Sequence, residues 1–369
     1  MLLISIYTAQ KICSVFFDGT TNDKTTGTNV WTMFDNMPGS QVAYSPQGLN
    51  KDNVEAYTKS IGEYRSVYVP GVGTSLSGAK NSQSLFGTGI EKRATIGYAY
   101  LLNVCEAEWG ENYRLKIVGF SRGAVTARMF ATYLSKFGIA AINLVSVATF
   151  DGSSTFERTF LYPDTVNTVG RVPVITFLGL FDTVASIGSA TKRYDPDDPS
   201  LQYPEPNFYP RLSLKIPMIV LNCAHAVAIN EYRSLFQYTP ITLDKSSWVQ
   251  QYFIGSHGDI GGYMNSKRQQ IALSWMSHLG FERALDNLAL VENVVFSLRA
   301  VPYKSSYAEA TITGGVISRS VDWPRIHFTA GQVAQDGNLA KTEDLLNSIW
   351  LDQALAASAK LVAIGKKND

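Results

Sequence analysis

Residues 114–124 constrain the fold of this chain more than any other segment. A run of strand-forming residues leads into Gly119–Gly123, which reads Gly-Phe-Ser-Arg-Gly, and residues 124–137 then carry apolar side chains at helical spacing. A serine at such a strand-to-helix turn has a strained backbone and an exposed hydroxyl, and the flanking glycines let strand and helix approach closely. The motif therefore predicts a nucleophile elbow at Ser121, with a simple helix turn capped by serine as the alternative.

Strand-like and helix-like segments alternate along the chain. The strand-like runs are Cys13–Phe17, Tyr64–Val69, Leu115–Gly119, Val174–Phe181, Met218–Cys223 and Gln251–Ile254. Amphipathic segments lie between several of them, notably Ile90–Trp109 and Arg122–Phe137. This alternation predicts the α/β class, with a mostly parallel central sheet covered by helices on both faces.

The length of 369 residues and the hydrophobic content of 45% fit a single large domain over residues 1–369. Two irregular insertions interrupt the alternating pattern, at residues 39–60 and 191–217. We expect residues 264–369 to form a C-terminal extension of helices and strands packed on the core, with an amphipathic helix at 341–364.

The insertion 191–217 contains six prolines interleaved with aromatic side chains. Long irregular loops in compact domains are usually functional or disordered, and disordered segments are poor in aromatic residues. We therefore predict a cap or lid here, with Tyr203, Phe208 and Tyr209 meeting an apolar substrate; a loop packed away from the site is the alternative.

Charge and cysteine content exclude several classes of function. The net charge is +1 and no dense Lys/Arg block occurs, so we expect neither nucleic-acid binding nor a polybasic membrane anchor. Cys13, Cys105 and Cys223 lack metal-ligand spacing and lie in apolar surroundings, so we expect them to be buried and reduced.

The apolar residues 1–9 are not preceded by a basic segment, as a signal peptide would be, and no apolar run is long enough to span a bilayer. These features indicate synthesis in the cytoplasm without a Sec signal.

Serine, aspartate and histidine residues follow several of the predicted strands at their carboxyl ends, which is where ligands bind in parallel sheets. A serine nucleophile needs a base, usually a histidine held by a carboxylate, and in elbow-type folds these follow in the order Ser, Asp, His. Ser121, Asp182 and His257 occur in that order. Two alternatives stay open from the residues alone, with Asp151 as the acid and His225, after the fifth strand, as the base or as a supporting group.

Stabilisation of an oxyanion needs backbone N–H groups that face the serine. The N–H of Arg122 is one candidate, and Gly19 with Thr20, after the first strand, supplies the other. Asp18 and Asp259 could form a metal site with His257, but their spacing matches no metal motif. We therefore expect no metal and no cofactor.

Five motifs together resemble one family. They are Phe16–Asn22, Gly119–Ala124, Gly179–Val184, His225 with Asn230–Arg233 and Phe236, and Gly255–Gly262. In this order they are similar to the α/β-hydrolase domain family that includes the type VI secretion phospholipase effectors with a G-x-S-x-G nucleophile. The resemblance implies an α/β-hydrolase core, phospholipase A activity, and a triad on Ser121, Asp182 and His257.

The same resemblance implies a cellular setting. The substrate would be a phospholipid or another ester, reached through transient contact with a membrane surface. Export would occur through type VI secretion into a target cell, with a secretion spike protein and an immunity protein as partners. A hydrolase of small non-lipid esters or amides would use the same residues, and a catalytically inactive binding module is the non-enzymatic alternative.

Overall fold

The structure is a computed structural model of the chain. It describes residues 11–46, 54–74, 90–109, 113–139, 142–150, 155–163, 171–185, 214–233, 236–264 and 269–281. The cap predicted at 191–217 lies outside the described residues except for 214–217, and the C-terminal extension lies outside them beyond residue 281. Both expectations therefore remain predictions.

An eight-stranded sheet forms the centre of the fold, in the order β10-β9-β8-β5-β1-β4-β3-β2. The parallel strands are β1 (Ile12–Phe17), β4 (Tyr64–Val69), β5 (Arg114–Phe120), β8 (Ile175–Phe181), β9 (Val220–Ala228) and β10 (Trp248–Phe253). Beyond β4, the strands β3 (Ala56–Ile61) and β2 (Ser40–Tyr44) pair antiparallel, with β2 at the edge of the sheet. The predicted α/β class with a mostly parallel sheet is confirmed, and all six predicted strands are present.

Two sequence-based boundaries were wrong. The segment 39–60, interpreted as an irregular insertion, supplies β2 and most of β3. The edge strand β2 is mostly exposed, so its sequence lacks the apolar pattern of a buried strand. The strand predicted to end at Cys223 continues to Ala228, so His225 lies within β9 and not after it.

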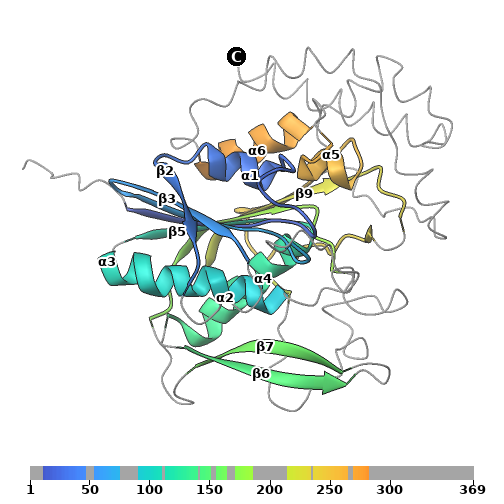
Figure 1. Cartoon of the computed structure of the whole chain (residues 1–369). Coiled ribbons are helices and arrows are strands. Elements are labelled where there is room, and N and C mark those ends of the chain that lie inside the picture. Colours follow the sequence, from blue (N-terminus) through green and yellow to red (C-terminus); the bar gives the residue numbers. More distant parts are fainter. Residues whose placement is uncertain are drawn as a thin grey trace, which may run out of the picture.

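Helices cover both faces of the sheet (Figure 1). One face carries α1 (Asn29–Asp35), α5 (His257–Gly261) and α6 (Gln269–Phe281), and the other carries α2 (Ile90–Tyr100), the π-helix η3 (Leu101–Glu106), α3 (Ala107–Trp109) and α4 (Arg122–Phe137). A separate hairpin, β6 (Ile142–Phe150) with β7 (Thr155–Pro163), lies beyond α2 and α4. Among the described helices, none is long and apolar enough to cross a membrane.

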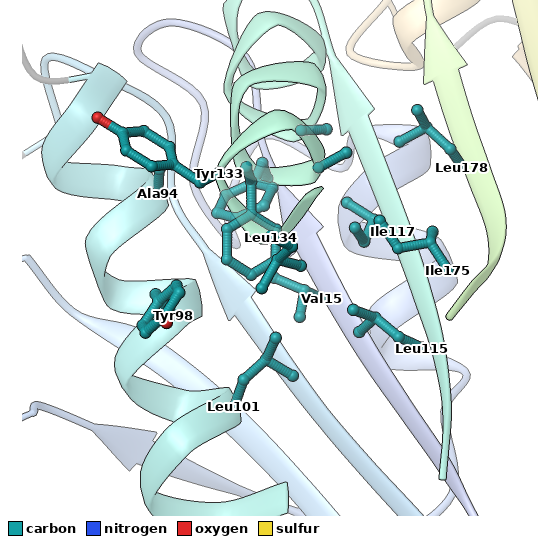
Figure 2. Packing of buried hydrophobic residues seen from close by; sticks show 14 of the residues in the cluster. Val15, Ala94, Tyr98, Leu101, Leu115, Ile117, Tyr133, Leu134, Ile175 and Leu178 are labelled. Carbon is teal, nitrogen blue, oxygen red and sulfur yellow. The ribbon is translucent and has the colours of Figure 1, made fainter. Parts of the chain in front are cut away.

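Strand β5 illustrates how the central strands are buried on both faces. Leu115 and Ile117 point into the cluster under α2 and α4, which Figure 2 shows, whereas Val118 and Phe120 pack in the cluster under α1 and α6. Each of these side chains is fully buried, which contributes about 1.5–3 kcal/mol per side chain. Burial on both faces explains why the second half of this strand, Ile117–Phe120, carries no polar side chain in the sequence.

Strands β1 and β5 are neighbours at the centre of the sheet, and the chain leaves them in opposite directions. After β1 it builds the half with β4, β3 and β2, and after β5 it builds the half with β8, β9 and β10. The helices that follow them, α1 and α4, cover opposite faces (Figure 1). Such a switch in direction opens a crevice at the carboxyl ends of the two strands, which is where ligands bind in open α/β sheets.

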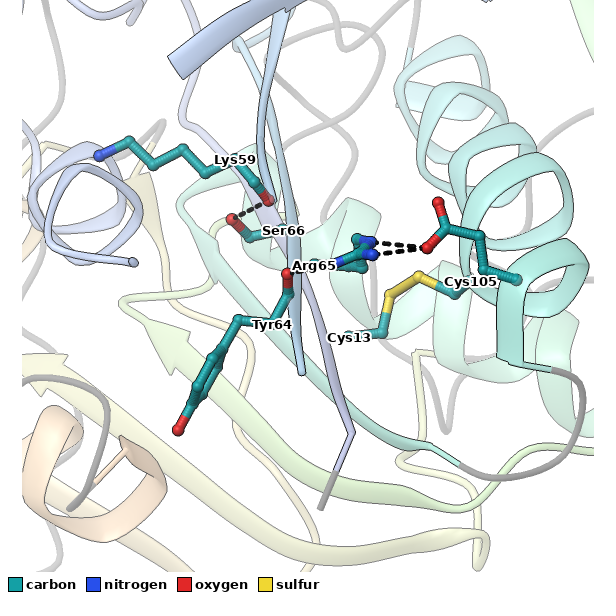
Figure 3. The surroundings of a disulfide bond; sticks show 7 residues. Cys13, Lys59, Tyr64, Arg65, Ser66 and Cys105 are labelled. Atoms are coloured by element: carbon teal, nitrogen blue, oxygen red, sulfur yellow. Dashed lines mark hydrogen bonds and ion pairs between the residues drawn. A yellow bond between two sulfur atoms is a disulfide. The ribbon is translucent and has the colours of Figure 1, made fainter. Parts of the chain in front are cut away.

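A disulfide joins Cys13 in β1 to Cys105 in η3, across 92 residues (Figure 3). The expectation that all cysteines are reduced was therefore wrong for this pair, whereas Cys223 is buried and free. The pairing depends on the packing of η3 against β1, which no spacing in the sequence reveals. Next to the disulfide, Arg65 forms an ion pair with Glu108 at 2.7 Å, which ties β4 to α3 on the same side of the sheet.

Candidate active site

Ser121 lies between β5 and α4 with φ 57° and ψ −122°, a conformation that residues other than glycine rarely adopt. Its N–H donates to the Phe181 carbonyl at 2.9 Å, which holds the turn against the end of β8. A Cβ atom on Gly123 would lie 2.2 Å from the Phe17 carbonyl oxygen, so only glycine lets α4 start so close to β1. The turn has the local geometry that the sequence predicted for a nucleophile elbow.

The side chains of Ser121, His257 and Asp182 form one hydrogen-bonded chain. The Ser121 hydroxyl lies 2.8 Å from His257 Nε2, and His257 Nδ1 lies 2.6 Å from Asp182 Oδ2. Because a carboxylate only accepts, the Nδ1–H donates to Asp182 and Nε2 is left to accept from the serine hydroxyl. All three residues are at most 3% exposed. This arrangement can remove the hydroxyl proton as the oxygen attacks.

Asp182 is held by the backbone of β9. Its N–H donates to the Ala226 carbonyl at 2.7 Å, and its Oδ1 accepts the N–H of Ala228 at 3.0 Å. Asp182 also has a positive φ of 40°, and the other described residues besides glycine with positive φ are Ser121 and Thr21. Strained backbone of this kind clusters at functional sites, and here it is confined to the ends of β1, β5 and β8.

His257 is the first residue of α5. Ser256 and Asp259 form a capping box at this helix end, with the Asp259 carboxylate accepting from the Ser256 N–H at 2.9 Å. The imidazole packs against two aromatic rings, with centroid distances of 4.7 Å to Phe120 and 5.0 Å to Phe236. Both the backbone and the ring of His257 are therefore constrained by neighbours.

His225, the rival base, bonds elsewhere. It is fully buried, its Nε2 accepts the Thr183 N–H at 3.1 Å, and its Nδ1–H donates to Gln250 Oε1 at 3.0 Å. Both ring nitrogens are thus engaged with groups other than Ser121, and His225 supports the turn next to Asp182. The rival acid, Asp151, lies outside the described residues.

The loop after β1 lies beside the elbow. Arg122 Nη1 donates to Thr20 Oγ1 at 3.0 Å, so the two sequence-predicted oxyanion segments are in contact. The N–H of Gly19 donates to Asp18 Oδ1 at 2.7 Å, whereas none of the described residues accepts from the N–H of Thr20. This leaves the N–H of Thr20, with that of Arg122, as the candidate pair of oxyanion donors.

The carboxylate of Asp18 holds this loop in place through hydrogen bonds. It is buried, and its Oδ2 accepts from Thr28 Oγ1 at 2.7 Å and from the Tyr68 hydroxyl at 2.6 Å. Burial raises the pKa of Asp18 to about 6, and the three hydrogen bonds to Tyr68, Thr28 and Gly19 only partly offset that rise. Within the described residues, no cluster of three His, Cys, Asp or Glu side chains could hold a metal ion.

Comparison with known proteins places this chain in a family. The family model for the type VI secretion system phospholipase effector, Tle1-like, catalytic domain, matches residues 11–278. The chain belongs to the Tle1-like catalytic domain family. The match covers every element that positions Ser121, Asp182 and His257. No curated protein matches the chain.

Two solved structures are similar to this Tle1-like chain. One is an uncharacterized protein from Pseudomonas aeruginosa, with 17% identity, a TM-score of 0.43, and coverage of 96% of this chain and 62% of that chain. The other is the Tle1 effector bound to the VgrG spike from the type 6 secretion system, with 20% identity, a TM-score of 0.38, and coverage of 69% and 52%. The chain thus spans about half to two thirds of the length of these two proteins.

Sequence reasoning about this Tle1-like domain gave no supporting role to two residues, although one of them, Glu231, lies in a motif that it singled out. Gln250 and Glu231 are buried polar residues that bond His225 and the backbone of His257, respectively. Gln250 shares one face of β10 with Trp248 and Tyr252, and a polar residue at that alternate position could have indicated a buried partner. The proposed substrate contacts Tyr203, Phe208 and Tyr209 lie outside the described residues.

Proposed function

We propose that this chain is a serine hydrolase that cleaves carboxylic ester bonds of phospholipids, as a phospholipase A. The hydrogen-bonded chain from Ser121 through His257 to Asp182 carries this proposal. A general base within hydrogen-bond reach of a strained, raised serine is what nucleophilic acyl transfer requires. Membership of a phospholipase effector family supports a lipid ester as the substrate.

The proposed reaction follows from these positions. Ser121 Oγ attacks the ester carbonyl carbon while His257 Nε2 takes the hydroxyl proton, and the Asp182 carboxylate stabilises the imidazolium. The oxyanion of the tetrahedral intermediate accepts from the N–H groups of Arg122 and Thr20. His257 then returns the proton to the leaving alkoxide, which departs as lysophospholipid. Water, deprotonated by His257, attacks the acyl-enzyme and releases the fatty acid and free Ser121.

The family also supports a cellular role. We propose that the chain is an antibacterial effector, made in the cytoplasm and exported by type VI secretion into a target cell. A secretion spike protein would carry it, in line with the Tle1 effector whose structure was solved with the VgrG spike. An immunity protein would protect the producing cell, and contact with the target membrane would be transient.

Ser121→Ala tests the proposed reaction, with Ser247→Ala as the matched control. Ser247 donates its hydroxyl to the Leu221 carbonyl, and it lies on the loop that precedes β10, at the opposite end of the sheet from Ser121. Each protein is incubated with vesicles of a phospholipid that carries different acyl chains at sn-1 and sn-2, and products are read by mass spectrometry. We expect lysophospholipid and fatty acid from wild type and Ser247→Ala, and a loss of at least about a thousandfold in Ser121→Ala.

The same experiment separates the alternatives. A fluorophosphonate probe should label wild type and Ser247→Ala but not Ser121→Ala. Hydrolysis of a short p-nitrophenyl ester without lipid cleavage would indicate a small-ester hydrolase and contradict the lipid assignment. If wild type neither cleaves any ester nor reacts with the probe, the proposal of a serine hydrolase is wrong.

A further inference from the structure

The segment that follows β9 runs beside the loop that carries His257. The Ile229 N–H donates to the Phe253 carbonyl at 3.0 Å, and the Asn230 N–H donates to the Gly255 carbonyl at 2.9 Å. Asn230 Oδ1 in turn accepts the N–H of Gly255 at 3.0 Å. These bonds continue the pairing of β9 and β10 beyond the ends of both strands, up to two residues before His257.

Glu231, the next residue, is fully buried and bonds the backbone of His257. Its Oε2 accepts the His257 N–H at 3.2 Å and Arg233 Nη2–H at 2.8 Å, and its Oε1 accepts from the N–H and Nε–H of Arg233. Burial alone would raise the pKa of Glu231, but hydrogen bonds and charge from Arg233, with the charge of His257, outweigh it and lower that pKa. Glu231 is therefore an ionised carboxylate beside the base.

The partner of Glu231 reaches the ring of His257 through a third residue. The Arg233 guanidinium lies 3.7 Å from the centroid of the Phe236 ring, and Phe236 meets the His257 imidazole edge-on at 5.0 Å. Phe120 covers another side of the imidazole at 4.7 Å. The ion pair thus connects to His257 at two points, at its backbone N–H and at its ring.

We propose that Glu231, Arg233 and Phe236 form a positioning unit for His257, with Glu231 holding its backbone and Phe236, stacked under Arg233, holding its ring. The inference rests on the proposed function, in which His257 is the general base. Catalysis by a base depends on its placement, since an error of about 1 Å can cost about a hundredfold in rate. The unit explains why an ion pair is buried next to a catalytic centre although buried ion pairs are weak contributors to stability.

The charged groups near His257 allow the positioning unit to be tested through the titration of His257. Asp182 bonds its ring from the end of β8, and Glu231, paired with Arg233, bonds its backbone from the segment after β9. Asp259 lies two residues along in α5 and bonds Ser256, and Tyr263, after α5, interacts with Arg233. Glu231→Gln removes one negative charge from this set and keeps Arg233. The imidazolium then loses stabilisation, so the pKa of His257 falls.

The test compares Glu231→Gln and Phe236→Leu with Tyr98→Phe. Tyr98 is buried between α2 and α4 and donates to the Gly138 carbonyl, so its loss weakens the fold away from the site. Steady-state kinetics on a soluble p-nitrophenyl ester should give kcat about tenfold lower for Glu231→Gln and about threefold lower for Phe236→Leu, with KM within about twofold of wild type. Tyr98→Phe should keep the wild-type kcat.

Titration of His257 by NMR supplies a readout that needs no activity. In the Ser121→Ala protein, whose four histidines are assigned by substitution, Glu231→Gln should lower the pKa of His257 by about one unit. An unchanged His257 titration, or kcat values for Glu231→Gln and Phe236→Leu within twofold of Tyr98→Phe, would overturn the positioning unit. If Glu231→Gln does not fold, the kcat of Phe236→Leu, which keeps the ion pair, tests the positioning unit by the same criterion. A shifted titration in a protein that hydrolyses no ester would support the unit and contradict the proposed function.

Discussion

Thr183 donates its backbone N–H to Nε2 of His225 at 3.1 Å, one residue beyond Asp182. His225 therefore carries its proton on Nδ1, where it donates to Gln250 Oε1 at 3.0 Å. A doubly protonated ring could not accept from Thr183, so this bond holds His225 neutral. His257 and His225 thus have different roles. His257 faces Ser121, whereas His225 supports the turn that carries Asp182.

Substitution of His225 should separate these tasks. His225→Ala leaves the buried Thr183 N–H without its acceptor, which costs about 1–3 kcal/mol in the free energy of unfolding. Ester hydrolysis should fall by about tenfold or less, whereas His257→Ala should lose about 10²–10⁴-fold. Urea unfolding and kinetics on a soluble ester measure both effects, with exposed His278→Ala as the control. Equal losses of activity for His225→Ala and His257→Ala would contradict the assignment of the base.

Backbone strain at Ser121 should lower the free energy of unfolding of the chain. Ser121 has φ 57° and ψ −122°, which costs a residue other than glycine about 1–3 kcal/mol. Ser121→Gly removes this strain and Ser121→Ala keeps it, while glycine also adds about 0.5–1 kcal/mol of backbone entropy to the unfolded state. We therefore expect Ser121→Gly to unfold at higher urea concentration than Ser121→Ala, although both are inactive. The reverse order would mean that the turn is not strained.

Asp18 should make stability depend on pH. Its pKa is about 6 in the folded chain against 3.8 for an ordinary aspartate, so the folded state binds the proton more tightly than the unfolded state. The stabilisation is complete below about pH 3.8 and is lost as pH rises through about 6, a change of about 3 kcal/mol.

Asp18→Asn removes this titration. Its free energy of unfolding relative to wild type should rise by about 2 kcal/mol between pH 4.5 and pH 7.5, as measured by urea unfolding. The comparison with wild type cancels the titration of groups that both proteins share. A pH-independent difference would show that Asp18 ionises normally.

Gly71 supports the loop proposed to bind the oxyanion. A Cβ atom at this position would lie 1.6 Å from the Gly19 carbonyl oxygen, so Gly71→Ala must displace the segment that carries the Thr20 N–H. Loss of one oxyanion donor typically costs about 100- to 1,000-fold in kcat, with less effect on KM. Kinetics on a soluble ester, with circular dichroism to verify folding, measure this effect. A folded Gly71→Ala protein with wild-type kcat would remove Thr20 from the oxyanion site.

The disulfide between Cys13 and Cys105 should stabilise the chain against unfolding. Closing a loop of 92 residues corresponds to about 4–5 kcal/mol in the chain-entropy model. We expect dithiothreitol to lower the melting temperature of wild type and to leave the Cys13→Ala/Cys105→Ala variant unchanged. Alkylation followed by intact mass measurement should find one free thiol in the oxidised protein, from Cys223. Three free thiols would exclude the bond.

Local patterns in the sequence predicted a large part of this protein. The elbow at Ser121, the six parallel strands and the order Ser121, Asp182, His257 all follow from hydrophobic periodicity and from glycines next to polar residues. These signals act over a few residues, because a strand buried on both faces or a strained turn restricts its own residue types whatever lies elsewhere in the chain.

The partners of each side chain were decided by the tertiary structure alone. Whether His225 or His257 faces Ser121 depends on the register of β9, which pairs His225 with Leu180 of β8 and with Gln250 of β10. The disulfide and the contact from Glu231 to His257 likewise join residues far apart in sequence. Such contacts form only when distant strands pair, and the local sequence of either partner does not specify the other.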